Sequence, residues 1–308
     1  MKRGQSAMVA LGIPGEWTWQ GWPIHYTKAG EDRRGLPILL IHGFGASVGH
    51  WRRNILALAE EHPVYALDLL GFGNSAKPIL NYTIDLWVNQ VRDFWQALIR
   101  RPVILVGHSV GGLVSLELAA RDRELTAGLC LISCADGPHP EELPAPLGWL
   151  VQGLCEGLVA VLACPLTYPA LFNWIRQKEV LRLWIQNVYR RTEAVDDELV
   201  TIFQQPAYDA NAQQVFIEAL KAILTRRFTS PRLLLPTIHK PILLLWGQED
   251  PAVPSFLADK FKEWQPRLTL VKLPGIGHCA HDELPTWVNT LLKEWIASLP
   301  LCPVPSHP

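Results

Sequence analysis

The chain has 308 residues, 49% of them hydrophobic, and its 28 Lys and Arg nearly balance its 29 Asp and Glu. This length allows one large domain or two, and the apolar fraction is sufficient for a substantial core. The near-neutral charge gives no attraction to nucleic acid, so we expect no nucleic-acid partner.

The six cysteines include no C-x-x-C pair and form no regular framework. We therefore expect them to be small buried side chains in a reducing compartment, and we expect neither disulfides nor a metal site. The start of the chain is basic, but the apolar stretch that follows is short and broken by Gly12 and Pro14. This is not the pattern of a signal peptide, and we expect a cytoplasmic protein.

Short apolar runs alternate with helical patterns along most of the chain. Trp17–Trp19 and Ile24–Tyr26 predict an opening hairpin. Six further strands are expected at Ile38–His42, Val64–Asp68, Val103–Val106, Leu129–Ser133, Ile242–Trp246 and Leu268–Leu273. Strands that alternate with helices predict an α/β fold with a doubly wound, mostly parallel sheet of eight strands and helices on both faces.

The alternation stops between Gly137 and Lys240, where the patterns are helical. This predicts a first core part at 1–136, a helical cap or lid at 137–240, a second core part at 241–300 and a Pro-rich tail at 301–308. Residues 157–175 carry no charge, but Pro165 and Pro169 disfavour a membrane-spanning helix.

A lid that lines an apolar pocket is our preferred interpretation of this uncharged segment. Shallow contact with a membrane and a plain helical core are the alternatives. Three tryptophans of the cap are expected to face either the substrate or the core of the cap: Trp149, Trp174 and Trp184.

A candidate nucleophile lies in Gly107-His108-Ser109-Val110-Gly111, which has the pattern G-x-S-x-G. The motif follows the predicted strand at Val103–Val106 and precedes a helical segment. In such a turn small residues leave room for a strained serine whose Oγ is exposed. We predict that Ser109 is the nucleophile; the alternative is an ordinary turn serine.

Two backbone N–H groups are the predicted oxyanion donors. The strand at Ile38–His42 ends in an H-G-x-G loop, which would contribute the N–H of Phe44. The residue after the nucleophile, Val110, would contribute the second.

An acid and a histidine follow the last two predicted strands. Asp250 is the predicted acid and His278 the predicted base, since the chain order Ser, Asp, His is that of α/β-hydrolases. Glu249 and Asp136 remain alternatives for the acid, and His281 for the base.

Other polar residues near these motifs are expected to be structural. His42 and His108 adjoin the motifs and are expected to orient loops, and His25 lies in an early strand. Asp68 ends the strand at Val64–Asp68, and we expect its carboxylate to hold the following turn.

The motifs HGFGAS (42–47), HWR (50–52), DLLGFGNSAKP (68–78), WGQEDP (246–251) and GHCAHDELP (277–285) resemble one branch of the α/β-hydrolase superfamily. This branch contains the chlorophyll dephytylases and pheophytinases of plants and cyanobacteria. The cap stretch from Asp197 to Glu218 resembles it too, so the resemblance covers about residues 17 to 296. His108 and Ala280 depart from the branch, in which Asn often precedes the nucleophile and Pro often follows the H-C pair.

The resemblance implies a serine esterase that hydrolyses a long isoprenoid ester, such as the phytyl ester of chlorophyll or of its magnesium-free form. It implies an acyl-enzyme on Ser109, no metal and no organic cofactor, and a cap that could contact the thylakoid membrane. A generic carboxylesterase, a carbon–carbon bond hydrolase and a non-catalytic binder of hydrophobic ligands are the alternatives. An epoxide hydrolase or haloalkane dehalogenase would need Asp where Ser109 stands.

Overall fold

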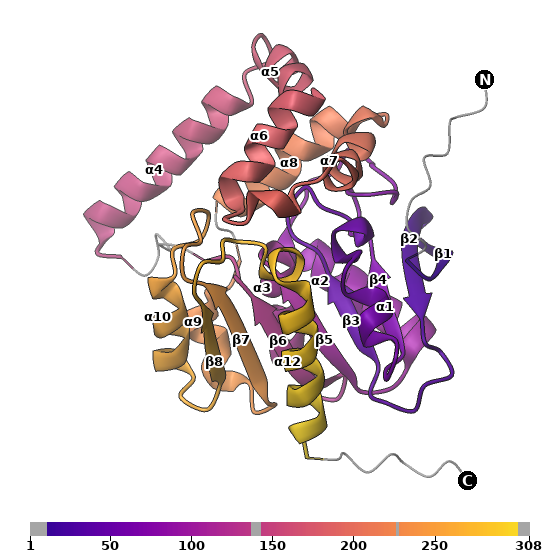
Figure 1. The fold of residues 1–308 in the computed structure, drawn as a ribbon. Helices are drawn as coiled ribbons and strands as arrows, with labels where there is room; N and C mark the ends of the chain where they lie inside the picture. Colours follow the sequence, from indigo (N-terminus) through magenta and orange to yellow (C-terminus); the bar gives the residue numbers. More distant parts are fainter. Residues whose placement is uncertain (1–10, 137–142, 226–227, 301–308) are drawn as a thin grey trace, which may run out of the picture.

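A computed structural model describes residues 11–136, 143–225 and 228–300. Its centre is an eight-stranded sheet with the strand order β1-β2-β4-β3-β5-β6-β7-β8 (Figure 1). The pairs β1–β2 and β2–β4 are antiparallel, and all later pairs are parallel. The strands are β1 (Ile13–Trp19), β2 (Trp22–Ala29), β3 (Ile38–Ile41), β4 (Val64–Leu67), β5 (Val103–His108), β6 (Thr126–Ile132), β7 (Ile242–Gly247) and β8 (Thr269–Leu273).

All eight predicted strands are present, and the doubly wound, mostly parallel sheet is confirmed. The opening hairpin turns at Gln20 and Gly21, which both have positive φ (49° and 83°). Two positive φ values match the twist of a two-residue hairpin.

Side-chain alternation along the strands builds a separate hydrophobic core on each face of the sheet. On β3, Leu39 and Ile41 join one core, whereas Ile38 and Leu40 join the other. The first core is covered by α2 (Ile84–Phe94), α3 (Val110–Arg121) and α10 (Phe256–Trp264). The second is covered by α1 (Ile55–Leu58) and α12 (Pro285–Ser298).

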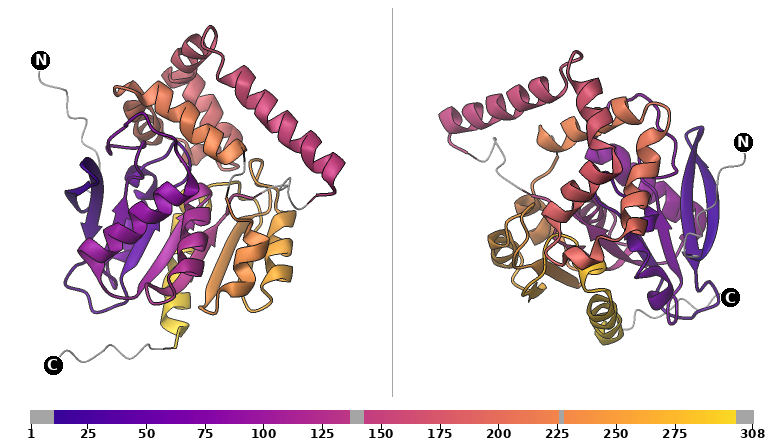
Figure 2. Two further views of the ribbon diagram at one scale, coloured as in Figure 1. Left: turned by 180° about the vertical axis from the view of Figure 1, so that it is seen from behind. Right: turned by 45° about the horizontal axis from the view of Figure 1, so that its top comes forward.

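Between β6 and β7 the described residues form helices and no strand, as the sequence predicts. We call α4 to α8 the insert: α4 (Ala145–Leu162), α5 (Tyr168–Ile175), α6 (Lys178–Val188), α7 (Asp197–Gln204) and α8 (Ala212–Leu224). Figure 2 shows the insert as a separate layer at one end of the sheet. The short helix α9 (Pro231–Leu234) packs instead against α3 and α10. The predicted cap range 137–240 thus includes α9, which packs with the core.

Helix α4 extends away from the other helices of the insert and contacts α8 (Figure 2). Glu156 is its one charged residue, and several of its large apolar side chains are exposed, including Trp149 at 74% and Leu154 at 65%. Trp174 and Trp184 are more than half exposed as well. These three tryptophans therefore lie at the surface, not in the core of the insert. In the part of the chain that the structure describes, no helix has the length and hydropathy needed to span a membrane.

The carboxylate of Asp68, just after β4, holds three segments together. It accepts hydrogen bonds from the N–H of Val48 (2.6 Å), from the N–H of Asn74 (2.7 Å) and from Nδ1 of His25 on β2 (3.0 Å). The expected structural roles of Asp68 and His25 are confirmed. Burial raises the pKa of Asp68, but His25 and the Val48 N–H outweigh this and hold it below its usual value. Burial lowers the pKa of His25, but Asp68 outweighs this and raises it.

We predict that Asp68→Asn lowers the free energy of unfolding by about 3 kcal/mol near pH 5, because a buried ion pair then loses one partner. The pKa of Asp68 is lowered by folding, so its contribution to stability is lost as the pH falls below about 4. The pKa of His25 is raised by folding, so its contribution is lost as the pH rises above about 6.5. Urea unfolding at pH 5 and pH 8.5 measures the difference. His25→Gln is the control for the pH-dependent part, and a loss no larger at pH 5 than at pH 8.5 would contradict the prediction.

Candidate active site

Ser109 occupies a strained backbone conformation at the sharp turn from β5 into α3. Its φ is 53° and its ψ is −117°, which non-glycine residues rarely adopt. The turn is held by hydrogen bonds from Ser109 N–H to the carbonyl of Ile132 (3.0 Å) and from the Ala135 N–H to the carbonyl of Ser109 (3.1 Å). Such strain persists only where the surrounding structure fixes it, and it is typical of functional sites.

Close packing requires a glycine at position 111, the second glycine of the G-x-S-x-G motif. A Cβ atom on Gly111 would lie 2.2 Å from the carbonyl oxygen of Ile41 and 2.5 Å from that of His42. The first turn of α3 therefore rests directly on the end of β3. This contact brings the H-G-x-G loop after β3 to the candidate nucleophile.

The two segments that carry the predicted oxyanion donors lie next to Ser109. Val110 is the first residue of α3, where a helix leaves its N–H without an intrahelical partner. Gly43, which precedes Phe44, lies close to Ser109: a Cβ atom on Gly43 would be 3.2 Å from the Cβ of Ser109. The structure thus brings the backbone on both sides of the expected oxyanion position together.

His278 and Asp250 form a buried hydrogen bond, with 2.8 Å between Nδ1 and Oδ2. The other carboxylate oxygen of Asp250 accepts from the N–H groups of Ala252 (2.8 Å) and Val253 (2.9 Å). The carboxylate is thereby fixed, and it keeps the imidazole proton on Nδ1. This leaves Nε2 of His278 with the lone pair that a general base needs.

The alternative acids occupy other environments. Glu249 pairs with Arg190 at the surface, with 2.7 Å between the two groups. Asp136 lies after β6, whereas Nδ1 of His278 is bound to the carboxylate that follows β7. The geometry therefore favours Asp250 among the three candidates.

The loop that carries His278 is fixed by a buried carboxylate that we did not identify from the sequence. Glu283 accepts hydrogen bonds from the N–H groups of Gly277, Cys279, Arg190 and Arg191, at 2.8 to 3.1 Å. The His278 N–H donates to the carbonyl of Val188, at the end of α6 (2.9 Å). These bonds tie the loop to the insert. The sequence gives no signal that separates Glu283 from an acidic residue on the surface.

A buried arginine makes a second connection between the core and the insert. The side chain of Arg52 is 3% exposed and contacts Asp196 (2.6 Å), Glu198 (3.0 Å) and Asp282 (3.2 Å). Asp196 caps the N-terminus of α7 by accepting from the Leu199 N–H. Asp282 belongs to α11 (Ala280–Glu283), directly after His278.

The histidines expected to orient loops do so. Nδ1 of His42 donates to the Gly43 carbonyl (2.8 Å), and its Nε2 accepts from the Leu69 N–H (3.0 Å). Nε2 of His108 lies 3.1 Å from the carbonyl oxygen of His278. His281 is fully buried, and neither of its ring nitrogens has a hydrogen-bond partner among the described residues. Of the two candidate histidines, His278 is therefore the one whose ring is hydrogen-bonded to a carboxylate.

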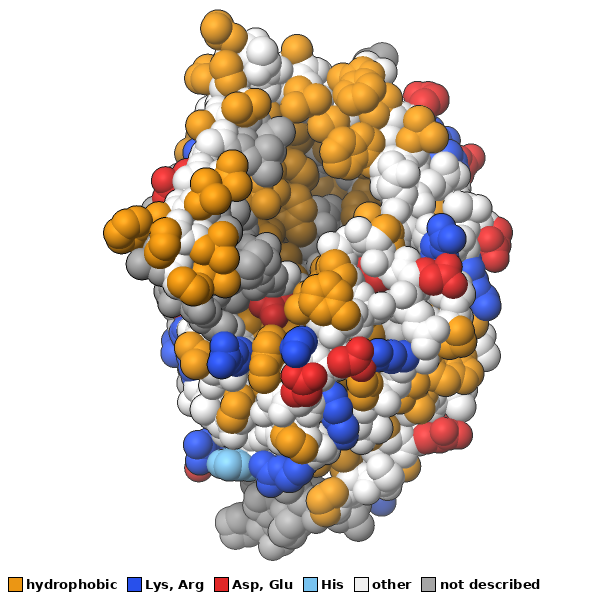
Figure 3. Space-filling view, turned by 90° about the vertical axis from the view of Figure 1, so that its left-hand side faces the viewer, with side chains coloured by type: hydrophobic (Ala, Val, Ile, Leu, Met, Phe, Trp, Pro, Cys, Tyr) orange, Lys and Arg blue, Asp and Glu red, His pale blue; other side chains and the backbone are white. Residues whose placement is uncertain are grey.

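Aromatic rings connect the H-G-x-G loop to the insert. The ring of Phe44 packs against Phe72 at 5.5 Å and against Phe216 of α8 at 4.8 Å, and Phe216 packs against Phe172 of α5 at 5.7 Å. Figure 3 shows a hollow beside the insert, with hydrophobic side chains in its walls. The surroundings of the candidate site are thus apolar on the side of the insert.

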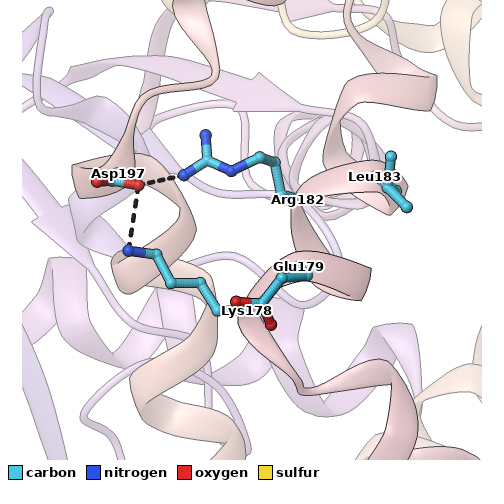
Figure 4. A pocket seen from close by; sticks show the side chains of 5 residues that line it. All are labelled: Lys178, Glu179, Arg182, Leu183 and Asp197. Atoms are coloured by element: carbon cyan, nitrogen blue, oxygen red, sulfur yellow. Dashed lines mark hydrogen bonds and ion pairs between the residues drawn. The ribbon is translucent and has the colours of Figure 1, made fainter.

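A separate surface pocket lies between α6 and α7, away from these residues (Figure 4). It is lined by Lys178, Glu179, Arg182, Leu183 and Asp197. Asp197 pairs with both Lys178 (3.1 Å) and Arg182. The pocket contains none of the candidate catalytic groups, and its two cationic side chains already pair with Asp197.

Known proteins similar to this chain include hydrolases of different substrates. The chain is 25% identical over 314 residues to the chloroplastic pheophytinase of Arabidopsis thaliana, an alignment that covers 90% of this chain and 64% of that protein. The chain thus spans just under two thirds of that relative's length. It is 28% identical over 271 residues to a 2-hydroxy-6-oxo-6-(2'-aminophenyl)hexa-2,4-dienoic acid hydrolase of Metapseudomonas resinovorans, with 86% and 84% covered.

Two of the solved structures that are similar to this chain are hydrolases. A membrane phospholipase A, described as a bacterial virulence factor, has a TM-score of 0.74 at 25% identity over 93% of this chain and 86% of that one. A serine hydrolase involved in carbazole degradation has a TM-score of 0.75 over 92% and 98%; at 24% identity it shows the fold alone. The model of the alpha/beta hydrolase family matches residues 38–291. The chain therefore belongs to the α/β-hydrolase family.

Proposed function

We propose that this hydrolase cleaves a carboxylic ester of a hydrophobic substrate through an acyl-enzyme on Ser109. The observation that carries the proposal is the buried hydrogen bond between His278 and Asp250, at the same edge of the sheet as the strained Ser109. All three residues follow the carboxyl ends of parallel strands, where ligands bind in open α/β sheets.

The proposed mechanism uses these groups in two steps. Oγ of Ser109 attacks the ester carbonyl carbon while Nε2 of His278 takes its proton, and the N–H groups of Phe44 and Val110 stabilise the oxyanion. The imidazolium returns the proton to the leaving alkoxide, and the alcohol departs. A water molecule then gives a proton to His278 and attacks the acyl group, which releases the acid and restores Ser109. Asp250 keeps Nδ1 protonated and stabilises the imidazolium.

The apolar surroundings support a long-chain ester, for which the phytyl ester of chlorophyll or pheophytin is our specific candidate. The Phe44, Phe216 and Phe172 rings provide an apolar wall that starts at the oxyanion loop. Each CH₂ buried there contributes about 0.8 kcal/mol before ordering costs. The similarity to a pheophytinase supports the same substrate class.

We further propose that the insert acts as a lid whose helix α4 contacts a lipid surface, where esters of this kind reside. The support is the exposure of Trp149, Leu154 and Val161, each at 65% or more, on a helix with one charged residue. Large exposed apolar side chains on one element are typical of interaction sites.

A carbon–carbon bond hydrolase is the second candidate function. It is favoured by the similarity to the 2-hydroxy-6-oxo-6-(2'-aminophenyl)hexa-2,4-dienoic acid hydrolase, which covers 84% of that protein. The apolar wall of Phe44, Phe216 and Phe172 is our reason for placing the ester first.

We predict that the protein releases phytol from chlorophyll a or pheophytin a, and that its turnover of nitrophenyl esters rises with acyl-chain length, because a longer chain buries more apolar surface. Ser109→Ala should lower turnover by about six orders of magnitude if the catalytic groups act as a unit. Chromatography of the released alcohol and acid measures both. With the substrate in phospholipid vesicles, the protein should sediment with them.

Each alternative gives a different result in this assay. A preference for acetate esters would contradict the long-chain substrate, and turnover of a ring-cleavage acid alone would support the carbon–carbon bond hydrolase. Ligand binding without turnover, unchanged in Ser109→Ala, would indicate a non-catalytic binder. Protein that stays in the supernatant would contradict the lipid contact.

We predict that Asp250→Asn lowers kcat by about four orders of magnitude, because the amide no longer keeps the proton on Nδ1 of His278. Asp136→Asn is the matched control, since it makes the same change after the neighbouring strand, and it should keep most of the activity. Steady-state kinetics on one nitrophenyl ester compares the two variants. The opposite result would assign the acid to Asp136.

A further inference from the structure

Three buried histidines from different segments converge behind the candidate site. His50 lies in a 3-10 turn after β3 (Val48–Trp51), His108 is the last residue of β5 and His281 lies in α11. All three residues are buried, with at most 3% of their surface exposed. The ring centre of His281 is 4.4 Å from that of His50 and 4.6 Å from that of His108. One nitrogen of each ring lies within 4.8 Å of the others.

The hydrogen bond of His108 defines its tautomer. Its Nε2 lies 3.1 Å from the carbonyl oxygen of His278, which can only accept. Nε2 therefore carries the proton, and Nδ1 carries a lone pair. This Nδ1 has no hydrogen-bond partner among the described residues.

A chain of hydrogen bonds defines the tautomer of His50 in the same way. The hydroxyl of Tyr189 donates to Oδ2 of Asp282 (3.1 Å), whose carboxylate pairs with Arg52. The Tyr189 oxygen is thus free to accept from Nε2 of His50, at 2.8 Å. Nδ1 of His50 is left with a lone pair and, within the described segments, without a partner.

His281 completes the group with a ring that makes no hydrogen bond to any described residue. Neutral imidazole is the form that binds metal ions, and the hydrogen bonds of His108 and His50 leave each of these rings one nitrogen with a lone pair. Their lone pairs need a donor or a cation.

We propose that His50, His108 and His281 form a binding site for a divalent transition-metal ion, with Zn²⁺ as the typical occupant. Neutral imidazoles suit zinc, copper and nickel rather than magnesium or calcium. Zinc–nitrogen bonds are about 2.0–2.1 Å long, so the three nitrogens, which lie within 4.8 Å of one another, would move closer together on binding. Water takes the fourth position in three-histidine zinc sites.

The groups around two of the three rings, His50 and His108, are those of a metal site. A metal-binding histidine donates its other N–H to a carbonyl or a carboxylate, which orients the ring. His108 donates to the His278 carbonyl, and His50 reaches Asp282 through the Tyr189 hydroxyl. A bound ion would join the loop after β3, the turn at Ser109 and α11. The cysteine pattern gave no reason to expect a metal, and these three histidines lie far apart in the chain.

The test is metal binding by the tag-free protein, which does not depend on the proposed esterase activity. After treatment with a chelator, the protein should bind one Zn²⁺ per chain, and Co²⁺ should give the visible absorption of a four- or five-coordinate site. Excess Zn²⁺ should raise Tm by a few degrees. His50→Gln and His281→Gln should each weaken binding about a hundredfold, and Tyr189→Phe about tenfold or more.

His239→Gln is the matched control, because it removes an exposed imidazole elsewhere on the surface. It should bind zinc as the unaltered chain does. No stoichiometric binding, or equal binding by the His50 and His281 variants, would overturn the proposal. Where a variant loses its circular dichroism spectrum, X-ray absorption of the zinc-loaded unaltered protein decides instead: three imidazoles are expected, and fewer would overturn it.

Discussion

The proposed chemistry depends above all on the hydrogen bond from His278 to Asp250. It keeps the proton on Nδ1 and leaves Nε2 as a base. Its geometry depends on two loops that leave neighbouring parallel strands, β7 and β8. The strained turn at Ser109 leaves β5 at the same edge, and the packing of Gly111 against the end of β3 brings in the H-G-x-G loop. The sheet thus positions four loops from distant parts of the sequence.

Buried polar groups hold these loops in place. Asp68 connects β2 to the loops after β3 and β4. Glu283 connects the loop that carries His278 to the end of α6. Arg52, in the loop after β3, connects that loop to α7 and α11. Each of these groups is satisfied by several partners, which makes its burial affordable and its geometry specific. The histidine group around His281 differs, since its lone pairs have no partner among the described residues. That contrast is the reason for inferring a cation there.

Local patterns were sufficient to predict the strands and the mostly parallel sheet, and they placed Ser109, Asp250 and His278 after the strand ends where the structure has them. These features depend on apolar runs and on short motifs at strand ends, both visible in one sequence. The roles of Glu283 and Arg52 were not predictable, because a buried ion pair and a surface one look alike in sequence. The sequence left the orientation of Trp149, Trp174 and Trp184 open, since composition does not tell which face of a helix is covered. The helical pattern of α9 likewise does not tell that this helix packs against α3 and α10.

The central claim is that Ser109 is a nucleophile activated by His278. The most direct measurement is mass spectrometry after treatment of the folded protein with an organophosphonate that resembles a lipid ester. We predict a single adduct, located on the peptide that contains Ser109, and no adduct in Ser109→Ala or in unfolded protein. An adduct on another residue, or no adduct on the folded protein, would contradict the account.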